Sequence, residues 1–241
     1  MSRIVPYGHH VGDASDPDGR GDALDALDAL DAVASAREDY ARGGLDEGDL
    51  LPEPTAMFRR WYDDAHAAGL HEPNAMVVAT VSEDCAPSAR LVLLKGVSEA
   101  GFVFYTNTRS RKGRELAGNP RCALLFPWHP LERQVRVDGT ASPLPREAVA
   151  GYFSVRPRGS QLGAWASHQS SVVADRAELE AAYAEAERRY SDGDVPTPEE
   201  WGGYVVRPES VEFWQGRPGR MHDRLVYRRT ATGWRTERLA P

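Results

Sequence analysis

The sequence predicts a mainly β domain with inserted helices, of the α+β class, built on an antiparallel barrel or sandwich. Runs rich in β-branched and aromatic residues recur between turn residues, and the strands return after the helices. These runs are residues 75–81, 89–95, 101–107, 121–128, 132–141, 204–216 and 221–229, and a run at 233–241 can add a last strand. Short strands at such regular spacing are typical of antiparallel barrels and sandwiches.

Helical patterns interrupt this series. The first helix is expected to start at Thr55, which can cap it, and to end at Gly69. Its apolar stripe consists of Met57, Phe58, Trp61, Tyr62 and Ala65. A second helix is predicted from a capping serine, Ser110, to Gly118. Two more are predicted over 145–157 and 173–190, with a polar loop or loop–helix connection between them.

Residues 1–34 are predicted to be an N-terminal extension that is disordered or of low complexity. The first 22 residues are rich in Gly, Asp and Pro, and the repeat "ALDALDALDAV" follows. A period of three drifts around a helix of 3.6 residues per turn, so the repeat gives no stable apolar stripe. Residues 35–241 are predicted to form one domain, because no linker interrupts the chain after residue 50.

Composition excludes several classes of protein. A formal charge of -7 over 241 residues argues against general binding to nucleic acid or to membrane surfaces. Two cysteines, Cys85 and Cys122, make a disulfide framework or a structural zinc site improbable. The sequence has no apolar run of ~20 residues and no signal-peptide core. We therefore expect a cytoplasmic protein that binds neither nucleic acid nor membrane and holds no metal.

The helix at Ser110 carries cations at the wrong end. Arg111 and Lys112 lie in its first turn, where each opposes the helix dipole by ~0.3–1 kcal/mol. A bound anion at this end would explain them, because free N–H groups, a hydroxyl and two cations suit a phosphate. The alternative is two solvent-exposed basic residues that a short helix tolerates.

Two further motifs carry basic residues. Arg90 and Lys95 have opposite parity in the run 89–95, so the strand is bulged, or the two serve different ligands, or both are ordinary strand-end charges. Tyr152, Arg156 and Ser160 are spaced i, i+4 and i+8 and would share one helix face. Since a proline follows Arg156, we expect Ser160 to enter from a loop. The three groups suit a phosphate, and an exposed helix end is the alternative.

The stretch "FWQGRPGRMHDR", residues 213–224, gathers the most positive charge. If a strand starts at "RMHDR", then Arg220, His222 and Arg224 share one of its faces. Side chains of one sign repel each other there, and an anionic ligand would relieve the repulsion. We read Arg217 as a turn residue that faces solvent. The sequence contains no dinucleotide fingerprint, P-loop, H-E-x-x-H or G-x-S-x-G motif.

Together, the ordered segments resemble the pyridoxamine 5′-phosphate oxidase family. The matching stretches are "RLVLLKG", "GFVFYTN", "SRKG", "NPRCALLFPWHPLERQVRVDG", "YFSVRPRGSQLGAWASHQSS", "WGGYVVRP", "VEFWQGRPGRMHDR" and "RLAP". They run over roughly residues 36–241, and only their ordered combination is specific. The resemblance implies a split antiparallel β-barrel with flanking helices that binds flavin mononucleotide (FMN) at the interface of a homodimer. Residues 1–34 have no counterpart in this pattern.

The resemblance also assigns residues. The expected FMN-binding residues are Arg90, Lys95, Tyr105, Thr106, Arg111, Lys112, Gln134, Gln169, Ser170, Trp214 and Arg224. The expected substrate-binding residues are Arg37, Tyr40, Lys95, Tyr152, Arg156, Ser160, Arg220 and His222. Of these, Arg220 and His222 are the expected catalytic pair over the flavin.

The implied reaction is oxidation of pyridoxamine 5′-phosphate and pyridoxine 5′-phosphate to pyridoxal 5′-phosphate, as part of vitamin B6 biosynthesis or salvage. Dioxygen is the acceptor and gives hydrogen peroxide, and the amine also yields ammonia. One alternative is a related FMN oxidase on another substrate, such as a phenazine precursor. Another is a non-catalytic protein that stores FMN or pyridoxal phosphate. The phosphate-binding set at Tyr152 argues against the first, and the pair at Arg220 argues against the second.

Overall fold

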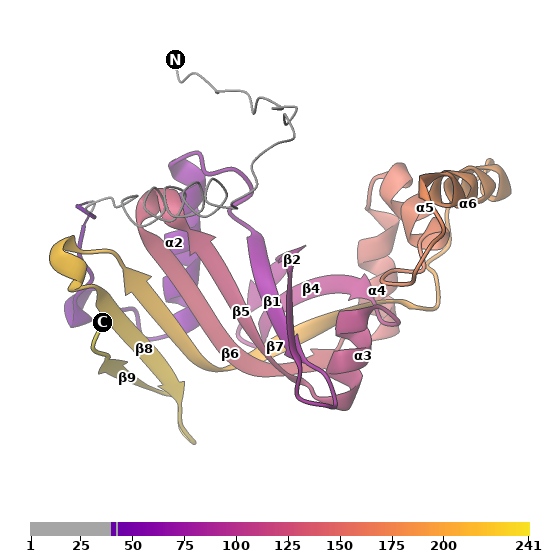
Figure 1. The fold of residues 1–241 in the computed structure, drawn as a ribbon. Coiled ribbons are helices and arrows are strands. Elements are labelled where there is room, and N and C mark those ends of the chain that lie inside the picture. Colours follow the sequence, from indigo (N-terminus) through magenta and orange to yellow (C-terminus); the bar gives the residue numbers. More distant parts are fainter. Residues whose placement is uncertain (1–39, 42) are drawn as a thin grey trace, which may run out of the picture. The chain divides into compact units, whose positions relative to one another are not determined.

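An antiparallel sheet dominates the part of the chain that the structure, a computed structural model, describes: residues 40, 41 and 43–241 (Figure 1). Its nine strands are β1 Ala75–Val81, β2 Pro87–Leu93, β3 Gly96–Ser98, β4 Gly101–Asn107, β5 Arg121–Trp128, β6 Arg133–Pro143, β7 Trp201–Gln215, β8 Asp223–Arg229 and β9 Trp234–Arg238. The order is β2-β1-β5-β6-β7-β4-β3, with β8 on β7 and β9 beyond β8. The α+β class and the antiparallel sheet are confirmed. The predictions for residues 1–34 lie outside the described residues.

Strand β7 is the axis of this sheet. One edge of β7 pairs with β6 along most of its length, whereas the other edge pairs first with β4 and then with β8. The register of β6 and β7 shifts at Asp138/Gly139. A side chain at Gly139 would place its Cβ 2.4 Å from the carbonyl oxygen of Arg207, so only glycine permits this close approach. Such an irregularity bends a strand, and the sheet in Figure 1 is strongly curled.

The helices are α2 Pro54–Ala67, α3 Arg111–Gly118, α4 Arg146–Ser154, α5 Arg158–Ala166 and α6 Arg176–Arg189. Helix α2 covers the curled sheet, and four of its five predicted stripe residues are fully buried while Tyr62 is partly buried. The ring of Phe58 packs 4.7 Å from that of Phe126, between ring centroids. Thr55 is not the cap: Pro54 occupies the first helical turn and Glu53 precedes it.

Other boundaries differ from expectation. Helix α5 forms in the segment predicted to be a loop or a loop–helix connection. Strand β7 begins at Trp201 rather than at residue 204. The predicted strand at 89–95 ends at Leu93, so its parity does not extend to Lys95. Short 3-10 helices are η1 Glu47–Asp49, η2 His129–Leu131 and η3 Pro218–Arg220. Among the described residues, we find no helix with the length and apolar character that crossing a membrane requires.

Candidate active site

A cavity of about 510 Å³ opens where β2, β4, α3, α4, α5 and the start of β7 meet. It collects most of the residues expected from the sequence to hold phosphate groups. The expected residues that line it are Lys95, Tyr105, Thr106, Lys112, Tyr152, Arg156, Ser160 and Gln169. Its described lining contains three cations and no carboxylate. The cavity is therefore suited to an anionic ligand.

Lys112 is the buried cation of this cavity. It lies in the first turn of α3, and its side chain donates to Thr106 Oγ1 (3.0 Å), Gln169 Oε1 (2.9 Å) and Ser110 Oγ (3.3 Å). All three acceptors are neutral. Burial, followed by the positive charge of Arg90, lowers the pKa of Lys112 to about 8. The alternative of two solvent-exposed basic residues therefore holds for Arg111 and fails for Lys112, which is buried.

Glu115, a residue that the sequence analysis missed, holds two further cations, Arg111 of α3 and Arg90 of β2. Its buried carboxylate accepts from Thr80 Oγ1 (2.5 Å), Ser88 Oγ (2.6 Å), Arg90 Nη2 (3.3 Å) and Arg111 Nε (2.8 Å). Burial alone would raise the pKa of Glu115, but the hydrogen bonds outweigh burial and lower it to about 2. The i,i+4 spacing of Arg111 and Glu115 was the available signal.

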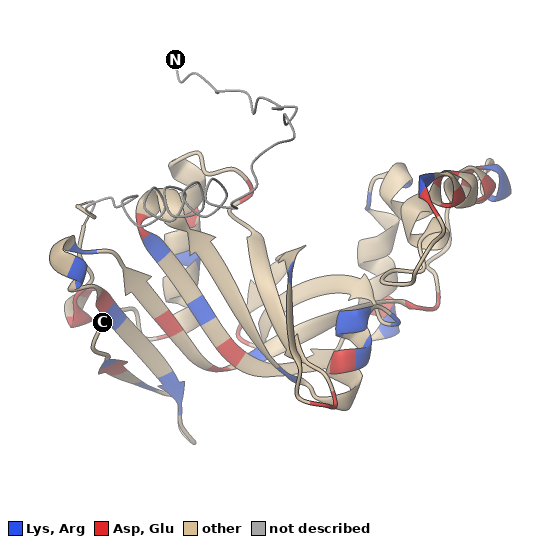
Figure 2. Cartoon of the chain, in the orientation of Figure 1, with Lys and Arg blue, Asp and Glu red and all other residues tan. Residues whose placement is uncertain are grey.

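Four linked residues at the start of α3 and on the neighbouring strand, namely Arg90, Arg111, Lys112 and Glu115, carry a net charge of +2. Arg90, Arg111 and Lys112 contribute three positive charges and Glu115 contributes one negative charge, with basic and acidic residues side by side on α3 (Figure 2). Ser110 caps the helix through a hydrogen bond from the Gly113 N–H, as predicted. A net charge of +2 beside a helix N-terminus matches a phosphate dianion.

Arg156 lies in the connection between α4 and α5. Its guanidinium carbon is 4.0 Å from the ring centroid of Trp201 and 5.4 Å from that of Phe153. Its buried Nη1 atom has no hydrogen-bond partner. Burial lowers the pKa of Arg156, and an anion would offset this cost.

The helix that carries Tyr152 ends before Pro157, as expected, but the loop expected for Ser160 is wrong. Helix α4 ends at Ser154, and Ser160 belongs to α5. The three residues nevertheless line the same cavity, because the two helices meet there. The ring of Tyr152 stacks on that of Tyr105, with centroids 3.9 Å apart and planes 10° from parallel.

A second group of expected residues lies at the far end of β7. Gln134, Trp214 and Arg224 are direct neighbours across β6, β7 and β8. Arg224 Nε donates to Glu212 Oε1 at 2.7 Å, and its Nη1 donates to the Ala240 carbonyl oxygen. Arg224 is therefore held in place by the buried carboxylate of Glu212.

An aromatic group covers this row. The Trp214 ring lies 4.7 Å from the His222 ring and 5.9 Å from the Tyr40 ring, between centroids, and the Tyr40 and His222 rings lie 5.7 Å apart. A Cβ at Gly216 would come within 2.8 Å of the Tyr40 ring, so the turn packs directly on this residue. The structure thus places Tyr40 beside the expected catalytic histidine, and Arg37 lies outside the described residues.

The predicted common strand face of Arg220, His222 and Arg224 is wrong. Strand β8 begins at Asp223, and Arg220 ends η3 with a positive φ of 62°. Arg217 is an exposed turn residue, as expected, and it also has several partners. Its Nη1 donates to the Gly43 carbonyl oxygen (2.9 Å), its backbone N–H donates to His222 Nδ1 (3.1 Å), and its Nε lies 3.5 Å from the Asp223 carboxylate.

The cavity and the second group lie at opposite ends of one strand. Trp201 and Trp214 are 13 residues apart on β7, which is about 43 Å in an extended strand at ~3.3 Å per residue. Figure 1 shows the β7–β8 turn and helices α4 and α5 on opposite sides of the sheet. Within one copy of the chain, over its described residues, the cavity and the second group therefore do not meet. Ser170, with a φ of 73°, lies in the loop after α5 and next to Gln169.

Other chemistry has little support among residues 40, 41 and 43–241. No group of three or more His, Cys, Asp or Glu side chains is arranged there to hold a metal ion. Cys85 and Cys122 are both free, and burial raises the pKa of Cys122 to about 12, which keeps this thiol protonated.

Two family models match the chain. One, described as pyridoxamine 5′-phosphate oxidase, matches residues 62–190, and the other, described as the pyridoxine 5′-phosphate oxidase C-terminal dimerisation region, matches residues 201–241. The chain belongs to the pyridoxamine 5′-phosphate oxidase family. The expected family membership is therefore confirmed, and with it the expectation of an enzyme.

Curated relatives of this family are similar over most of the chain. A pyridoxine/pyridoxamine 5′-phosphate oxidase of Nocardioides sp. is 72% identical over 209 residues, which is 87% of this chain and 98% of the relative. A protein of the same name from Rubrobacter xylanophilus is 57% identical over 87% of this chain and 96% of its own length.

Solved structures agree with the fold. PhzG from Burkholderia lata 383, in complex with tetrahydrophenazine-1-carboxylic acid, has a TM-score of 0.77 and 32% identity over 82% of this chain and 98% of its own. A pyridoxamine 5′-phosphate oxidase-related, FMN-binding protein from Nostoc punctiforme has a TM-score of 0.63 and 16% identity over 80% of this chain and all of its own. The expected split-barrel fold of the family is thus confirmed.

Proposed function

We propose that the chain oxidises pyridoxamine 5′-phosphate and pyridoxine 5′-phosphate to pyridoxal 5′-phosphate in vitamin B6 biosynthesis or salvage. Dioxygen is the acceptor, hydrogen peroxide is a product, and the amine substrate also releases ammonia. One observation carries this proposal: a cavity lined by Lys95, Lys112 and Arg156, and by no carboxylate among the described residues, has one cationic region at α3 and a second at Arg156. Two phosphate groups, one from FMN and one from the substrate, would occupy them.

The first region fits the phosphate of FMN. The net +2 charge of Arg90, Arg111, Lys112 and Glu115 lies at the capped end of α3, where N–H groups are free. Tyr105, Thr106, Gln169 and Ser170 are next to this region and would bind the rest of the cofactor. FMN, when bound, would accept the hydride that leaves C4′ of the substrate.

The second region fits the substrate phosphate. Lys95 and Arg156 supply two positive charges, and Tyr152 and Ser160 supply hydroxyl donors on the same cavity wall. Lys95 faces both regions in this proposal. Arg220 and His222 would hold the pyridine ring at the other end of the substrate, and Tyr40, beside His222, would cover it.

The separation of the two groups along β7 supports a homodimer. A second copy would bring its Gln134, Trp214 and Arg224, together with Arg220 and His222, to the cavity that the first copy leaves open. The match of residues 201–241 to a dimerisation region agrees, since this segment contains the β7 and β8 contributions. Two free cysteines fit a reducing compartment, and we propose a cytoplasmic location.

The decisive experiment uses the purified protein. We expect a flavin absorbance spectrum, or one that appears after FMN is added, and formation of pyridoxal 5′-phosphate and peroxide from pyridoxamine 5′-phosphate under air. Absence of both flavin binding and peroxide would refute the proposal. Arg220→Ala and His222→Ala should lower turnover or substrate affinity with FMN still bound. Arg235→Ala, whose arginine pairs with Glu237 on β9, is the matched control and should change neither.

The similarity to PhzG supports one alternative, an FMN oxidase on a phenazine-type substrate. Such a substrate carries a carboxylate and no phosphate, so the substrate-phosphate region around Arg156 would serve no purpose. A yellow protein that oxidises tetrahydrophenazine-1-carboxylic acid but neither phosphorylated vitamer would establish this alternative. A yellow protein inert toward all three would indicate a non-catalytic FMN-binding or pyridoxal-phosphate-binding protein.

A further inference from the structure

The guanidinium of Arg156 is held in a way that differs from the other site arginines. Arg90, Arg111 and Arg224 each pair with a buried carboxylate. The Arg156 guanidinium has no hydrogen bond or ion pair within the described residues, and its Nη1 is buried without a partner. Its close contacts are two aromatic rings, with Trp201 the nearer at 4.0 Å and Phe153 at 5.4 Å. The orientation of the Arg156 guanidinium is therefore set by its packing against the rings of Trp201 and Phe153.

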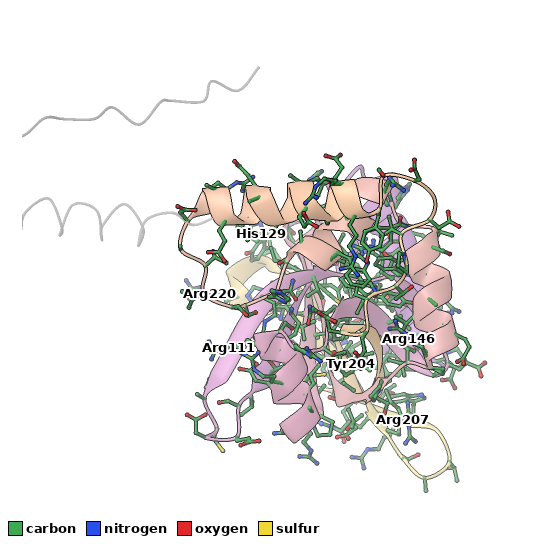
Figure 3. All side chains as sticks on the ribbon, turned by 90° about the vertical axis from the view of Figure 1, so that its right-hand side faces the viewer. Arg111, His129, Arg146, Tyr204, Arg207 and Arg220 are labelled. Carbon is green, nitrogen blue, oxygen red and sulfur yellow. The ribbon has the colours of Figure 1, made fainter. Side chains whose placement is uncertain are left out.

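Trp201 is a fixed support for that cation. It is the first residue of β7 and lies opposite Asn107 of β4 in the sheet register. Arg146, labelled in Figure 3, donates to the Trp201 carbonyl oxygen at 2.8 Å and also bonds two carbonyl oxygens of the preceding loop. The Phe153 ring packs edge-on against the indole, with centroids 5.9 Å apart. Trp201 also lines the cavity. Its contacts with Arg146 and Phe153 therefore hold the indole in place beside the space that a ligand would occupy.

We propose that Trp201 is a positioning residue that aims Arg156 at the substrate phosphate and thereby makes the enzyme select phosphorylated over unphosphorylated vitamers. A cation over an indole face is attracted to the ring without losing its hydrogen-bond donors to a carboxylate. All the guanidinium donors that face the cavity thus stay free for phosphate, and the charge of Arg156 is not neutralised. This inference rests on the proposed function for the identity of the substrate.

The test compares Trp201→Leu with Trp201→Phe. Leucine keeps apolar volume but removes the ring, so we expect KM for pyridoxamine 5′-phosphate to rise about tenfold, with kcat within about twofold of wild type. Phenylalanine restores a ring face and should recover most of this loss. Turnover of unphosphorylated pyridoxamine and the dissociation constant of FMN should not change. Trp165→Leu, a tryptophan of α5 that contacts Arg189 instead, is the matched control and should behave as wild type.

A double-mutant cycle isolates the coupling. In an Arg156→Ala background, Trp201→Leu should change KM by less than about twofold, because the residue it positions is gone. Inorganic phosphate serves as a second probe: its dissociation constant, measured by calorimetry on the FMN-loaded protein, should rise with Trp201→Leu and not with Trp165→Leu. If Trp201→Leu unfolds the protein, Trp201→Phe against Trp201→Met gives the same comparison of a ring with an apolar side chain that has none.

Two results would overturn the inference while leaving the proposed function intact. One is a wild-type enzyme that oxidises pyridoxamine 5′-phosphate and a Trp201→Leu variant with unchanged KM and unchanged phosphate affinity. The other is a Trp201→Leu variant that loses activity equally toward phosphorylated and unphosphorylated substrates, or that no longer binds FMN. Either outcome would make Trp201 a structural residue. If the wild type oxidises no vitamer, the proposed function fails, and the phosphate titration alone decides on Trp201.

Discussion

The lowered pKa of Lys112 predicts that FMN affinity depends on pH in a range where ordinary lysines do not titrate. Lys112 is 7% exposed, and its ammonium group donates only to neutral oxygens and has a pKa of about 8 instead of 10.5. An anion that binds the charged form loses this partner as the pH rises through that pKa. The phosphate of FMN stays a dianion over this range, since its second pKa is near 6.

The magnitude follows from the fraction of protein with a charged Lys112. With a pKa of about 8, this fraction is roughly 0.9 at pH 7 and roughly 0.1 at pH 9, so the dissociation constant of FMN should rise about tenfold, or ~1.4 kcal/mol. A lysine with the usual pKa would change it by less than about 5%. The sign for folding without ligand is opposite. Because the pKa is lower in the folded state, burial of Lys112 destabilises the fold below pH 8, and this penalty disappears as the pH approaches 10.5.

The assay is quenching of flavin fluorescence on titration of FMN into apoprotein at fixed ionic strength between pH 7 and 9. Lys112→Met should bind FMN more weakly with no pH dependence in this range. Lys112→Arg keeps a charge that does not titrate, so it should also be independent of pH. A flat wild-type profile, or the wild-type slope in Lys112→Met, would refute the reasoning.

Three further outcomes follow from the contacts. Gly113→Ala would place a Cβ 2.2 Å from the Thr108 backbone, so the free energy of unfolding, measured by urea denaturation, should fall by ~1–3 kcal/mol. The control Gly163→Ala, with no atom within 4 Å of its Cβ, should show no such loss. Arg217→Ala removes the hydrogen bond to the Gly43 carbonyl oxygen. A protease should therefore cleave near residue 43 faster, at an unchanged melting temperature. The folded-state pKa of Glu115 lies below its usual value of 4.5, so its stabilising effect should be full above pH 4.5 and lost as the pH falls toward 2, and Glu115→Gln should remove this dependence in acid-denaturation curves.

The sequence was most informative where local pattern and three-dimensional burial coincide. The alternating strands and the stripe of α2 appear as expected, because each buries a face that its own residues define. For the opposite reason, the sequence left two options at α5, a polar loop or a loop–helix connection. Helix α5 contains Gly159 and Gly163, and it is held by distant contacts, such as Gln161 Nε2 to the Phe153 carbonyl oxygen and Arg158 to the Gly193 carbonyl oxygen. Local propensity does not contain those partners.

The candidate site shows the same division. Cations in the first turn of a helix were a local anomaly, so Arg111 and Lys112 alone were enough to suggest an anion site at α3, with exposed basic residues as the alternative. Glu115 could not be assigned a role, because three of its four donors come from β1 and β2. The partner of Arg217 at Gly43 is 174 residues away. Which charges are neutralised is thus decided by pairing between elements, and only the presence of the charges is visible in the sequence.

The turn at residues 216–222 connects Tyr40, the proposed substrate cover, with His222, the proposed catalytic histidine, through Arg217. Its backbone N–H donates to His222 Nδ1, so a neutral His222 must carry its proton on Nε2. Its guanidinium holds the Gly43 carbonyl oxygen, three residues after Tyr40, whose ring packs on His222. One residue therefore fixes both the donor atom that the histidine can present to a pyridine ring and the segment that packs over it. Loosening this turn should disturb substrate binding through two routes at once, even though Arg217 is itself exposed to solvent.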